Sequence, residues 1–288
     1  MRRFVLFGLL LFAATAAWAQ PVLKSSLVAE FSSGLSEPHD AAFSPDGKLL
    51  FLTDMRNSRM VVLEALTLKQ VGVFGEKELS NPHDAEFDKA GRLLVADTGN
   101  NRIAIYEVKG AEARFTGELK GLSGPEGVTV APDGRVIVTN TRSANLSVFR
   151  DGKLERTVGG YGAKDGEFSN PHDVEAAPDG SIWVVDSGND RVQVFDASFK
   201  HRASLGPALK LNSPKYLAFD AGRVWVADEY NHRVLQLDGK GQLVGVLGTG
   251  KRGRSATEFY KPEAVLARAP HVWVIDTYNS RVVLLRVE

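Results

Sequence analysis

The stretch DGEFSNPHDVEAAPDGSIWVVDSGNDRVQVFD, residues Asp165–Asp196, decides the fold of this chain. A short run, DVEAA, leads into a PDG turn, and two apolar-rich runs, SIWVVD and RVQVFD, follow it. Val, Ile, Phe and Trp that alternate with polar residues and are broken by Gly, Asn and Asp indicate β-strands joined by tight turns. The stretch therefore predicts three consecutive strands, with no window that carries a helical period.

The same pattern recurs along the whole chain. An Asp ends an apolar run, an Arg follows five residues later, and successive anchors stand 42 to 48 residues apart. The pairs are Asp54/Arg59, Asp97/Arg102, Asp186/Arg191, Asp228/Arg233 and Asp276/Arg281, with a degenerate copy at Asn140/Asn145. A Pro precedes each anchor, at Pro38, Pro82, Pro125, Pro171, Pro214 and Pro262.

The connecting segments supply a fourth strand to each repeat, as LKQVGVFG (Leu68–Gly75) does in the first one. Four strands in a unit of about 44 residues are typical of a propeller blade. Six anchors therefore predict an all-β fold, a six-bladed β-propeller of four-stranded antiparallel blades.

The two ends of the chain indicate how the ring closes. The last repeat stops after its third strand, and an extra strand, SLVAEF (Ser26–Phe31), stands ahead of the first repeat. We expect this N-terminal strand to complete the last blade, which makes residues 20–288 a single domain. Closure by β-pairing leaves only short outer edges. The chain contains no cysteine, so this pairing would hold the ring together in place of disulfides.

The first residues have the pattern of an export signal. Met1-Arg2-Arg3 is followed by an apolar run to Ala17 and by an A-x-A cleavage site that ends at Ala19. We expect residues 1–19 to be a signal peptide and the mature protein to be periplasmic or secreted. No later stretch is apolar enough to predict a membrane span after cleavage.

Charge and motif content exclude several classes of protein. The formal net charge is +0, and loss of Arg2 and Arg3 leaves it at about −2, so no basic face is predicted to attract nucleic acid. The basic run Lys251–Arg254 is interpreted as a solvated loop. The sequence contains no G-x-S-x-G, no H-E-x-x-H and no phosphate-cradling glycine loop.

Two recurring features have a structural interpretation. The Asp and Arg of each hairpin are spaced to pair across the turn, and the joint change to Asn140 and Asn145 favours a mutual partnership over a catalytic role. Trp183, Trp225 and Trp273 each stand three residues before an anchor Asp. We expect these indoles to pack between adjacent blades.

The triplet Pro-His-Asp occurs in only some repeats. The residues after the six prolines, in order, are His39, His83, Glu126, His172, Lys215 and Glu263. They open the first strand of each blade, which lines the central channel of a propeller, so they should form one ring at the channel mouth. A structural role would repeat in every blade, whereas a mixed ring suits one asymmetric ligand site.

Imidazoles that converge on one point favour zinc or another divalent cation. His39, His83 and His172 are the candidate metal ligands, and the ring residues Glu126, Lys215 and Glu263 are candidates for ligand binding. The adjacent Asp40, Asp84 and Asp173 would orient the imidazoles by accepting hydrogen bonds from their N–H groups. Alternation along a strand places neighbouring His and Asp side chains on different sides, and His residues that only cap the channel mouth remain the alternative.

These repeats resemble the NHL repeat, most closely in Asp165–Asp196 and in the second repeat, and least in the third. The resemblance runs from about Glu37 to Glu288 and implies a six-bladed NHL propeller. Some similarity to peptidyl-α-hydroxyglycine α-amidating lyase propellers implies that His39, His83 and His172 are zinc ligands and that glyoxylate is the leaving product. That family also uses a tyrosine near the metal, for which Tyr216 is the geometric candidate.

Two functions are therefore expected. The first is an exported propeller that binds a small molecule, peptide or protein at the channel mouth, as a monomer and without nucleic acid. The alternative is the metal-dependent lyase, and a lactonase-like metal propeller is a weaker third option, because its acidic ligands are not recognisable in this sequence.

Overall fold

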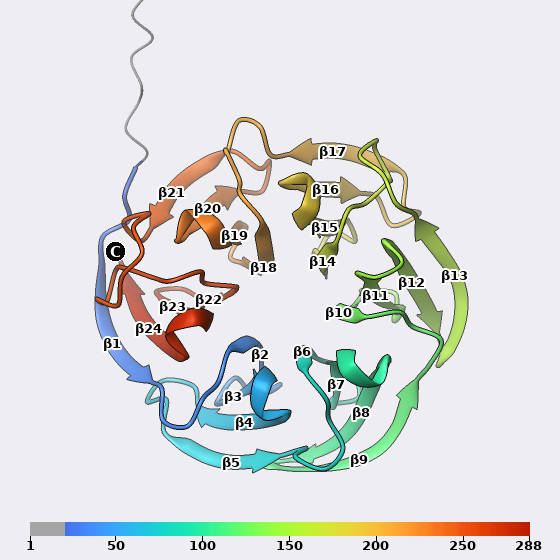
Figure 1. The fold of residues 1–288 in the computed structure, drawn as a ribbon, viewed down its shortest axis with the longest axis horizontal. Coiled ribbons are helices and arrows are strands. Elements are labelled where there is room, and N and C mark those ends of the chain that lie inside the picture. The colour runs from blue at the N-terminus through green and yellow to red at the C-terminus, as the bar shows by residue number, and fades with distance from the viewer. Residues whose placement is uncertain (1–20) are drawn as a thin grey trace, which may run out of the picture.

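The blades of the predicted propeller are present in the structure, a computed structural model that describes residues 21–288. Within these residues the strands form six four-stranded antiparallel sheets around a common axis (Figure 1). The predicted all-β, six-bladed fold is confirmed. The predicted signal peptide, residues 1–19, lies outside the described residues. No helix within residues 21–288 has the length and apolar character needed to cross a bilayer.

Blades 1 to 5 use their strands in chain order from the axis outward, and blade 6 takes the N-terminal strand as its outermost one. Blade 1 consists of β2 (Pro38–Phe43), β3 (Leu49–Asp54), β4 (Arg59–Glu64) and β5 (Gln70–Phe74). Blade 2 consists of β6 (Pro82–Phe87), β7 (Arg92–Asp97), β8 (Arg102–Lys109) and β9 (Glu112–Leu119). Blade 3 consists of β10 (Pro125–Val130), β11 (Val136–Asn140), β12 (Asn145–Arg150) and β13 (Lys153–Gly159).

The second half of the ring repeats this order. Blade 4 consists of β14 (Pro171–Ala176), β15 (Ile182–Asp186), β16 (Arg191–Phe195) and β17 (His201–Leu205). Blade 5 consists of β18 (Pro214–Asp220), β19 (Arg223–Asp228), β20 (Arg233–Asp238) and β21 (Leu243–Leu247). Blade 6 consists of β22 (Ala264–Arg268), β23 (His271–Asp276), β24 (Arg281–Val287) and β1 (Ser25–Phe31).

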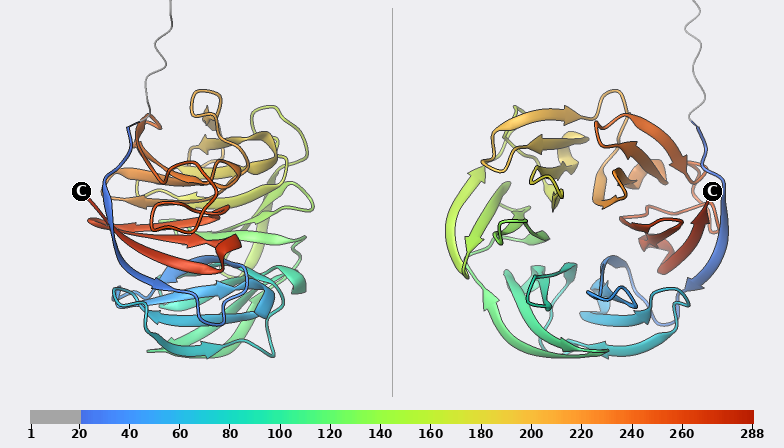
Figure 2. Two further views of the ribbon diagram at one scale, coloured as in Figure 1. Left: turned by 60° about the vertical axis from the view of Figure 1, so that its left-hand side comes forward. Right: turned by 180° about the vertical axis from the view of Figure 1, so that it is seen from behind.

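The N-terminal strand closes the ring. β1 pairs antiparallel with β24, from Ser25 opposite Val287 to Phe31 opposite Val282. Figure 2 shows the blue β1 lying along the red last blade. The predicted closure by the N-terminal strand is confirmed, and the edge of β24 is thereby paired instead of being left open.

The repeated Asp and Arg form a clamp at each regular hairpin. In blade 2, Asp97 Oδ2 accepts hydrogen bonds from Arg102 Nε at 2.6 Å and from Asn100 Nδ2 at 2.8 Å. Its Oδ1 accepts from the backbone N–H of Ser80 at 2.7 Å. The carboxylate therefore ties the hairpin to the segment that enters the same blade, which supports the structural interpretation of this pair.

Five of the six blades carry a single 3₁₀ turn inside this hairpin. These turns are η1 (Met55–Asn57), η2 (Thr98–Asn100), η3 (Ser187–Asn189), η4 (Glu229–Asn231) and η5 (Thr277–Asn279). In blade 3, which keeps no Asp/Arg pair, Asn140 Nδ2 donates to Asn145 Oδ1 at 3.0 Å. The two residues that changed together still contact one another.

The hydrophobic core lies between adjacent blades. Leu50 and Leu52 of blade 1 pack in one cluster with Trp273 and Ile275 of blade 6. Trp273 Nε1 donates to the carbonyl oxygen of Ala65 at 2.7 Å. The indole thus fills apolar space and satisfies its polar atom across the blade boundary, as expected for this position.

Candidate functional site

The turn before each inner strand aims the following residues at the axis. The residue that precedes each repeat Pro has a positive φ, at Glu37, Asn81, Gly124, Asn170, Ser213 and Lys261. Just after it the register of the sheet shifts, for example between Pro38 and Ala41. Strict strand alternation is therefore interrupted, and both His39 (6 % exposed) and Asp40 (9 % exposed) are buried near the axis.

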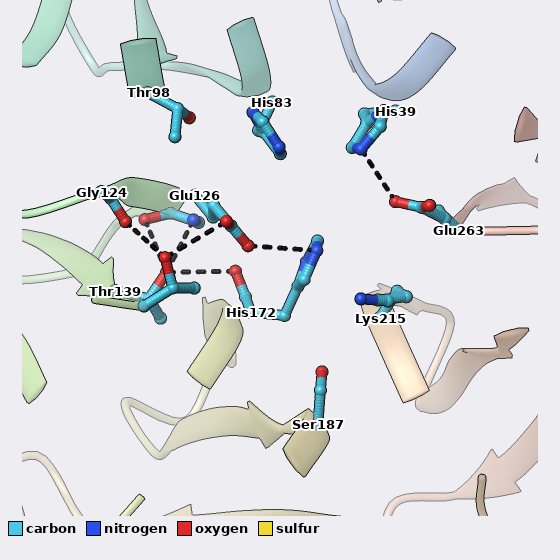
Figure 3. A network of polar contacts seen from close by, with 12 residues as sticks. His39, His83, Thr98, Gly124, Glu126, Thr139, His172, Ser187, Lys215 and Glu263 are labelled. Carbon is cyan, nitrogen blue, oxygen red and sulfur yellow. Dashed lines mark hydrogen bonds and ion pairs between the residues drawn. The ribbon is translucent and has the colours of Figure 1, made fainter. Parts of the chain in front are cut away.

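Hydroxyl groups of neighbouring blades fix the backbone that carries the imidazoles. Thr53 Oγ1 of blade 1 lies 2.9 Å from the carbonyl oxygen of His83 in blade 2. Thr139 Oγ1 of blade 3 donates in the same way to the carbonyl oxygen of His172 at 3.0 Å (Figure 3). These bonds hold the His-bearing strands at a defined distance across the blade boundaries.

The three imidazoles meet at the channel mouth. The rings of His39 and His83 have centroids 4.5 Å apart, in an edge-on arrangement. The rings of His83 and His172 are 6.3 Å apart. Figure 3 shows the three side chains converging from three different segments of the chain. The structure thus brings together the residues that the sequence singled out.

Backbone carbonyls orient two of these rings. His39 Nδ1 lies 3.1 Å from the carbonyl oxygen of Glu37, and His83 Nδ1 lies 2.8 Å from that of Asn81. These contacts place the ring proton on Nδ1, so Nε2 keeps its lone pair. His172 differs, because its buried Nδ1 has no hydrogen-bond partner within the described residues.

Two ring carboxylates face the imidazoles. His39 Nε2 lies 3.1 Å from Glu263 Oε2, and His172 Nε2 lies 3.2 Å from Glu126 Oε2 (Figure 3). The contact to Glu263 Oε2 lacks the geometry of a hydrogen bond. The predicted ring residues therefore do share one site, in which the carboxylates contact the same nitrogens that a cation would use.

Burial keeps the imidazoles neutral. Desolvation lowers the pKa of His39 to about 4, and desolvation together with the charge of His39 lowers the pKa of His83 to about 4. Burial also holds the pKa of His172 well below its usual value. Burial raises the pKa of Glu263 to about 8. At neutral pH the site therefore offers uncharged imidazoles beside a largely protonated carboxyl group.

Blade 5 contributes a lysine and a tyrosine. Lys215 Nζ points into the mouth (Figure 3) and lies 3.6 Å from Glu229 Oε2. The Tyr216 ring lies edge-on to His172 at 4.9 Å, and its hydroxyl donates to the carbonyl oxygen of Glu126 at 3.4 Å. Burial raises the pKa of Tyr216 well above its usual value, so this hydroxyl keeps its proton.

The aspartates of the Pro-His-Asp triplets are buried close to one another. Asp84 Oδ2 accepts from the N–H of Val128 at 2.6 Å, and Asp173 Oδ2 accepts from the N–H of Leu217 at 2.9 Å. Burial and the charge of Asp84 raise the pKa of Asp40 well above its usual value. Within residues 21–288, the imidazole Nδ1 contacts run to backbone oxygens and not to these aspartates.

Sequence reasoning missed two further carboxyl groups in the channel. Glu86 and Glu175 line a cavity of about 250 Å³ together with Asp40 and Tyr216. Burial and the charge of Asp84 raise the pKa of Glu86 to about 8. The available signal was the spacing, because in PHDAEF and PHDVEA the Glu stands two residues after the Asp and so falls on the same side of a strand.

The basic run Lys251–Arg254 lies in a loop and makes two surface contacts. Arg252 lies over the Tyr260 ring, with its guanidinium carbon 3.8 Å from the centroid. Arg254 Nη2 lies 3.3 Å from Glu30 Oε1. Lys251, Arg252 and Arg254 are nevertheless exposed, so the interpretation of this run as a solvated loop agrees with the structure.

Metal ligation requires a further adjustment of these side chains. Among residues 21–288, no group of three or more His, Cys, Asp or Glu side chains is already disposed to hold a metal ion. The donor set nevertheless has suitable chemistry, because neutral imidazoles with Nδ1 anchored on a carbonyl are typical metal ligands.

Comparison with known proteins agrees with this architecture. The NHL repeat family matches residues 79–106, 122–149, 168–195 and 211–237. The matched segments fall on the three inner strands of blades 2 to 5, including blade 3, whose sequence resembles the repeat least. The chain therefore carries NHL repeats within a six-bladed β-propeller fold. No curated protein sequence matches the chain significantly.

Several solved structures share the fold. A streptogramin B lyase is similar with a TM-score of 0.65 and 14 % identity, covering 94 % of this chain and 99 % of its own. An auxiliary nutrient binding protein from Bacteroides ovatus has a TM-score of 0.69 and 14 % identity, covering 94 % and 76 %. Hydrazine synthase from Kuenenia stuttgartiensis has a TM-score of 0.62 and 15 % identity, covering 89 % and 97 %. At such identities the likeness concerns the fold alone.

Proposed function

We propose that this protein binds a ligand at the channel mouth and that His39, His83 and His172 hold a divalent cation there, zinc in the first place. The observation that carries the proposal is the convergence of three neutral imidazoles from three blades, with ring centroids 4.5 and 6.3 Å apart. Three imidazoles leave a coordination position open for a ligand or water.

Two local features support the fit of a cation. The carbonyl oxygens of Glu37 and Asn81 hold Nδ1 of His39 and His83, which leaves Nε2 free to donate a lone pair. His172 keeps a buried Nδ1 without a partner, and such an atom costs free energy unless something binds it. Cation binding would replace the contacts that Glu126 and Glu263 now make.

The remaining groups of the mouth have distinct roles in this proposal. A bound zinc ion supplies a Lewis acid with an open position. Lys215 provides a positive charge beside the imidazoles, and Glu263, which is largely protonated at pH 7, provides a hydrogen-bond donor. The carbonyl groups of Glu37 and Asn81 keep the imidazole orientation fixed while the ligand exchanges.

The proposal is tested by the double variant His83→Ala, His172→Ala. We expect the variant to lose bound metal and ligand-induced thermal stabilisation while its β-rich circular dichroism stays unchanged. His201→Ala, on the outer strand β17, is the matched control and should bind like the wild type. Equal metal content in all three proteins would contradict the proposal.

A second candidate is a lyase that resembles the peptidyl-α-hydroxyglycine α-amidating enzymes. The observation that favours it is Tyr216, whose ring lies edge-on to His172 and whose hydroxyl keeps its proton. The reaction would break the C–N bond of the hydroxyglycine, with the peptide amide and glyoxylate as products. Glyoxylate release from a hydroxyglycine peptide, lost in Tyr216→Phe, distinguishes the lyase from a binding protein.

The location and state of the protein are part of the proposal. We infer that residues 1–19 direct export to the periplasm or the medium and that the mature chain acts as a monomer. Fractionation of cells that express the full chain, with N-terminal sequencing of the product, tests cleavage after Ala19. Light scattering of the purified mature protein tests the monomer.

A further inference from the structure

Two lysines at the edge of the mouth share a single carboxylate. Lys215 Nζ lies 3.6 Å from Glu229 Oε2, and Lys261 Nζ lies 3.5 Å from Glu229 Oε1. Glu229 is only 3 % exposed and also accepts a hydrogen bond from Ser213 Oγ at 3.0 Å. Two ammonium groups therefore flank this one buried carboxylate.

Aromatic rings border this lysine pair. Lys261 Nζ lies 4.0 Å from the ring centroid of Tyr230 and 4.5 Å from that of Tyr278. Both rings are accessible, because Tyr230 is 49 % exposed and Tyr278 is 40 % exposed. The Tyr260 ring extends this aromatic surface, because the centroids of the Tyr260 and Tyr278 rings are 5.4 Å apart. We call the four residues Lys261, Tyr230, Tyr260 and Tyr278 the aromatic rim.

The aromatic rim is continuous with the imidazole site. Lys215 belongs to the ring of the mouth and Lys261 to the aromatic rim, and Glu229 contacts both. Glu263, which faces His39, follows Lys261 by two residues. Lys215 and Glu229 therefore connect the imidazole site with the aromatic rim on blades 5 and 6.

We propose that Lys215, Lys261 and the aromatic rim bind a ligand that carries one carboxylate next to an aromatic or flat apolar group. The inference rests on the proposed ligand site at the mouth and adds the chemistry of its ligand. Two ammonium groups that already share one carboxylate suit a monoanion better than a phosphate dianion, and the exposed rings of Tyr230 and Tyr278 offer stacking area to the neighbouring group.

The probe is benzoylglycine, an acid with an aromatic ring, compared by calorimetry with its amide and with acetylglycine. We expect the acid to bind about tenfold more tightly than the amide, as for a charge-assisted hydrogen bond of about 1.5 kcal/mol or more. Acetylglycine, which lacks the ring, should bind more weakly than benzoylglycine. Phenyl phosphate tests the dianion and should bind less tightly than benzoylglycine.

Variants assign the effect to the lysines. Lys215→Gln and Lys261→Gln should each remove most of the preference for the acid over the amide, and Tyr278→Leu should reduce the advantage over acetylglycine. Lys153→Gln, on the outer strand β13, is the control and should change nothing. Unfolding temperatures verify that each variant is folded.

The outcomes separate this inference from the proposed function. Preference for the acid that survives in His83→Ala, His172→Ala but disappears in Lys261→Gln supports the lysine pair even if the imidazoles bind no metal. Preference that disappears only in the histidine variant overturns the inference and leaves the proposed function standing. Equal binding of acid and amide, tighter binding of phenyl phosphate, or no binding of any probe at millimolar concentration also overturns it.

Discussion

The imidazole of His39 lies edge-on to the imidazole of His83 with ring centroids 4.5 Å apart, although blade 1 carries one and blade 2 the other. The closed ring is the reason for this proximity, because it brings the first residues of every inner strand to one axis. The contact is therefore a direct consequence of the repeat, and the chemistry of the mouth depends on which residue each blade places after its proline.

The Asp/Arg clamp of blade 6 should be a major contributor to stability. Asp276 is fully buried and accepts a 2.7 Å bond from Arg281 Nε, and Arg281 is 1 % exposed. Asp276→Ala leaves a buried guanidinium short of its main partner, so we expect a loss of about 3 kcal/mol in the free energy of unfolding. Urea unfolding of the variant measures this loss.

Two further variants sharpen the test of the clamp. Glu112→Ala removes an exposed carboxylate on β9 and should change the free energy of unfolding by less than about 0.5 kcal/mol. The double change Asp276→Asn, Arg281→Asn reproduces the pair of blade 3 and should cost less than the sum of the single changes. Additive losses would indicate that the two side chains do not act as a pair.

Ring closure by β1 gives a second prediction. A chain that begins at Ser32 lacks β1 and leaves β24 as an open edge, whereas a chain that begins at Pro21 keeps it. We expect the free energy of unfolding of the shorter chain to fall by more than about 3 kcal/mol, the scale of a large core truncation. We also expect the shorter chain to aggregate through the open edge of β24. Equal unfolding temperatures for the two chains would show that closure contributes little.

Glu86 gives a prediction on pH. Burial raises its pKa to about 8, above the value of about 4.3 expected in an unfolded chain. The native state therefore keeps a proton that the unfolded chain releases, and the stability contributed at low pH is lost as the pH rises from about 4 through about 8. Glu86→Gln removes this loss.

The measurement is the free energy of unfolding of wild type and Glu86→Gln between pH 5 and pH 8. We expect the variant to gain on the wild type as the pH rises, by at most about 1.4 kcal/mol per pH unit for one proton. Glu112→Gln, an exposed change on β9, should follow the wild-type curve. A constant difference between Glu86→Gln and wild type over this range would refute the assigned pKa.

The fold could be predicted from the sequence because every repeat carries the same pattern of strands and turns. Apolar alternation, the Asp/Arg spacing and the extra strand Ser26–Phe31 all indicate the same closed ring. The prediction of the fold therefore does not depend on the weak repeat of blade 3. The ring of residues after the prolines followed from the repeat register alone. Its members could be identified because His39, His83 and His172 occupy equivalent positions.

The finer geometry could not be predicted from the sequence. Strand alternation predicts different sides for His39 and Asp40, but the register shift after Pro38 lets both approach the axis. Glu229 and Lys261 lie outside the ring positions, and only the folded chain brings them beside Lys215. Contacts of this kind depend on loop conformation and on side chains from different blades, which no local pattern encodes.

The most direct measurement of the central claim is the metal content of purified mature protein that was prepared without chelator, followed by zinc titration after metal removal. We expect about one zinc ion per chain, bound by His39, His83 and His172. The zinc affinity should fall as the pH approaches the pKa of about 4 of His39 and His83, because protons then compete with zinc for the imidazoles. A metal-free wild-type protein that also fails to take up added zinc, cobalt or nickel would contradict it.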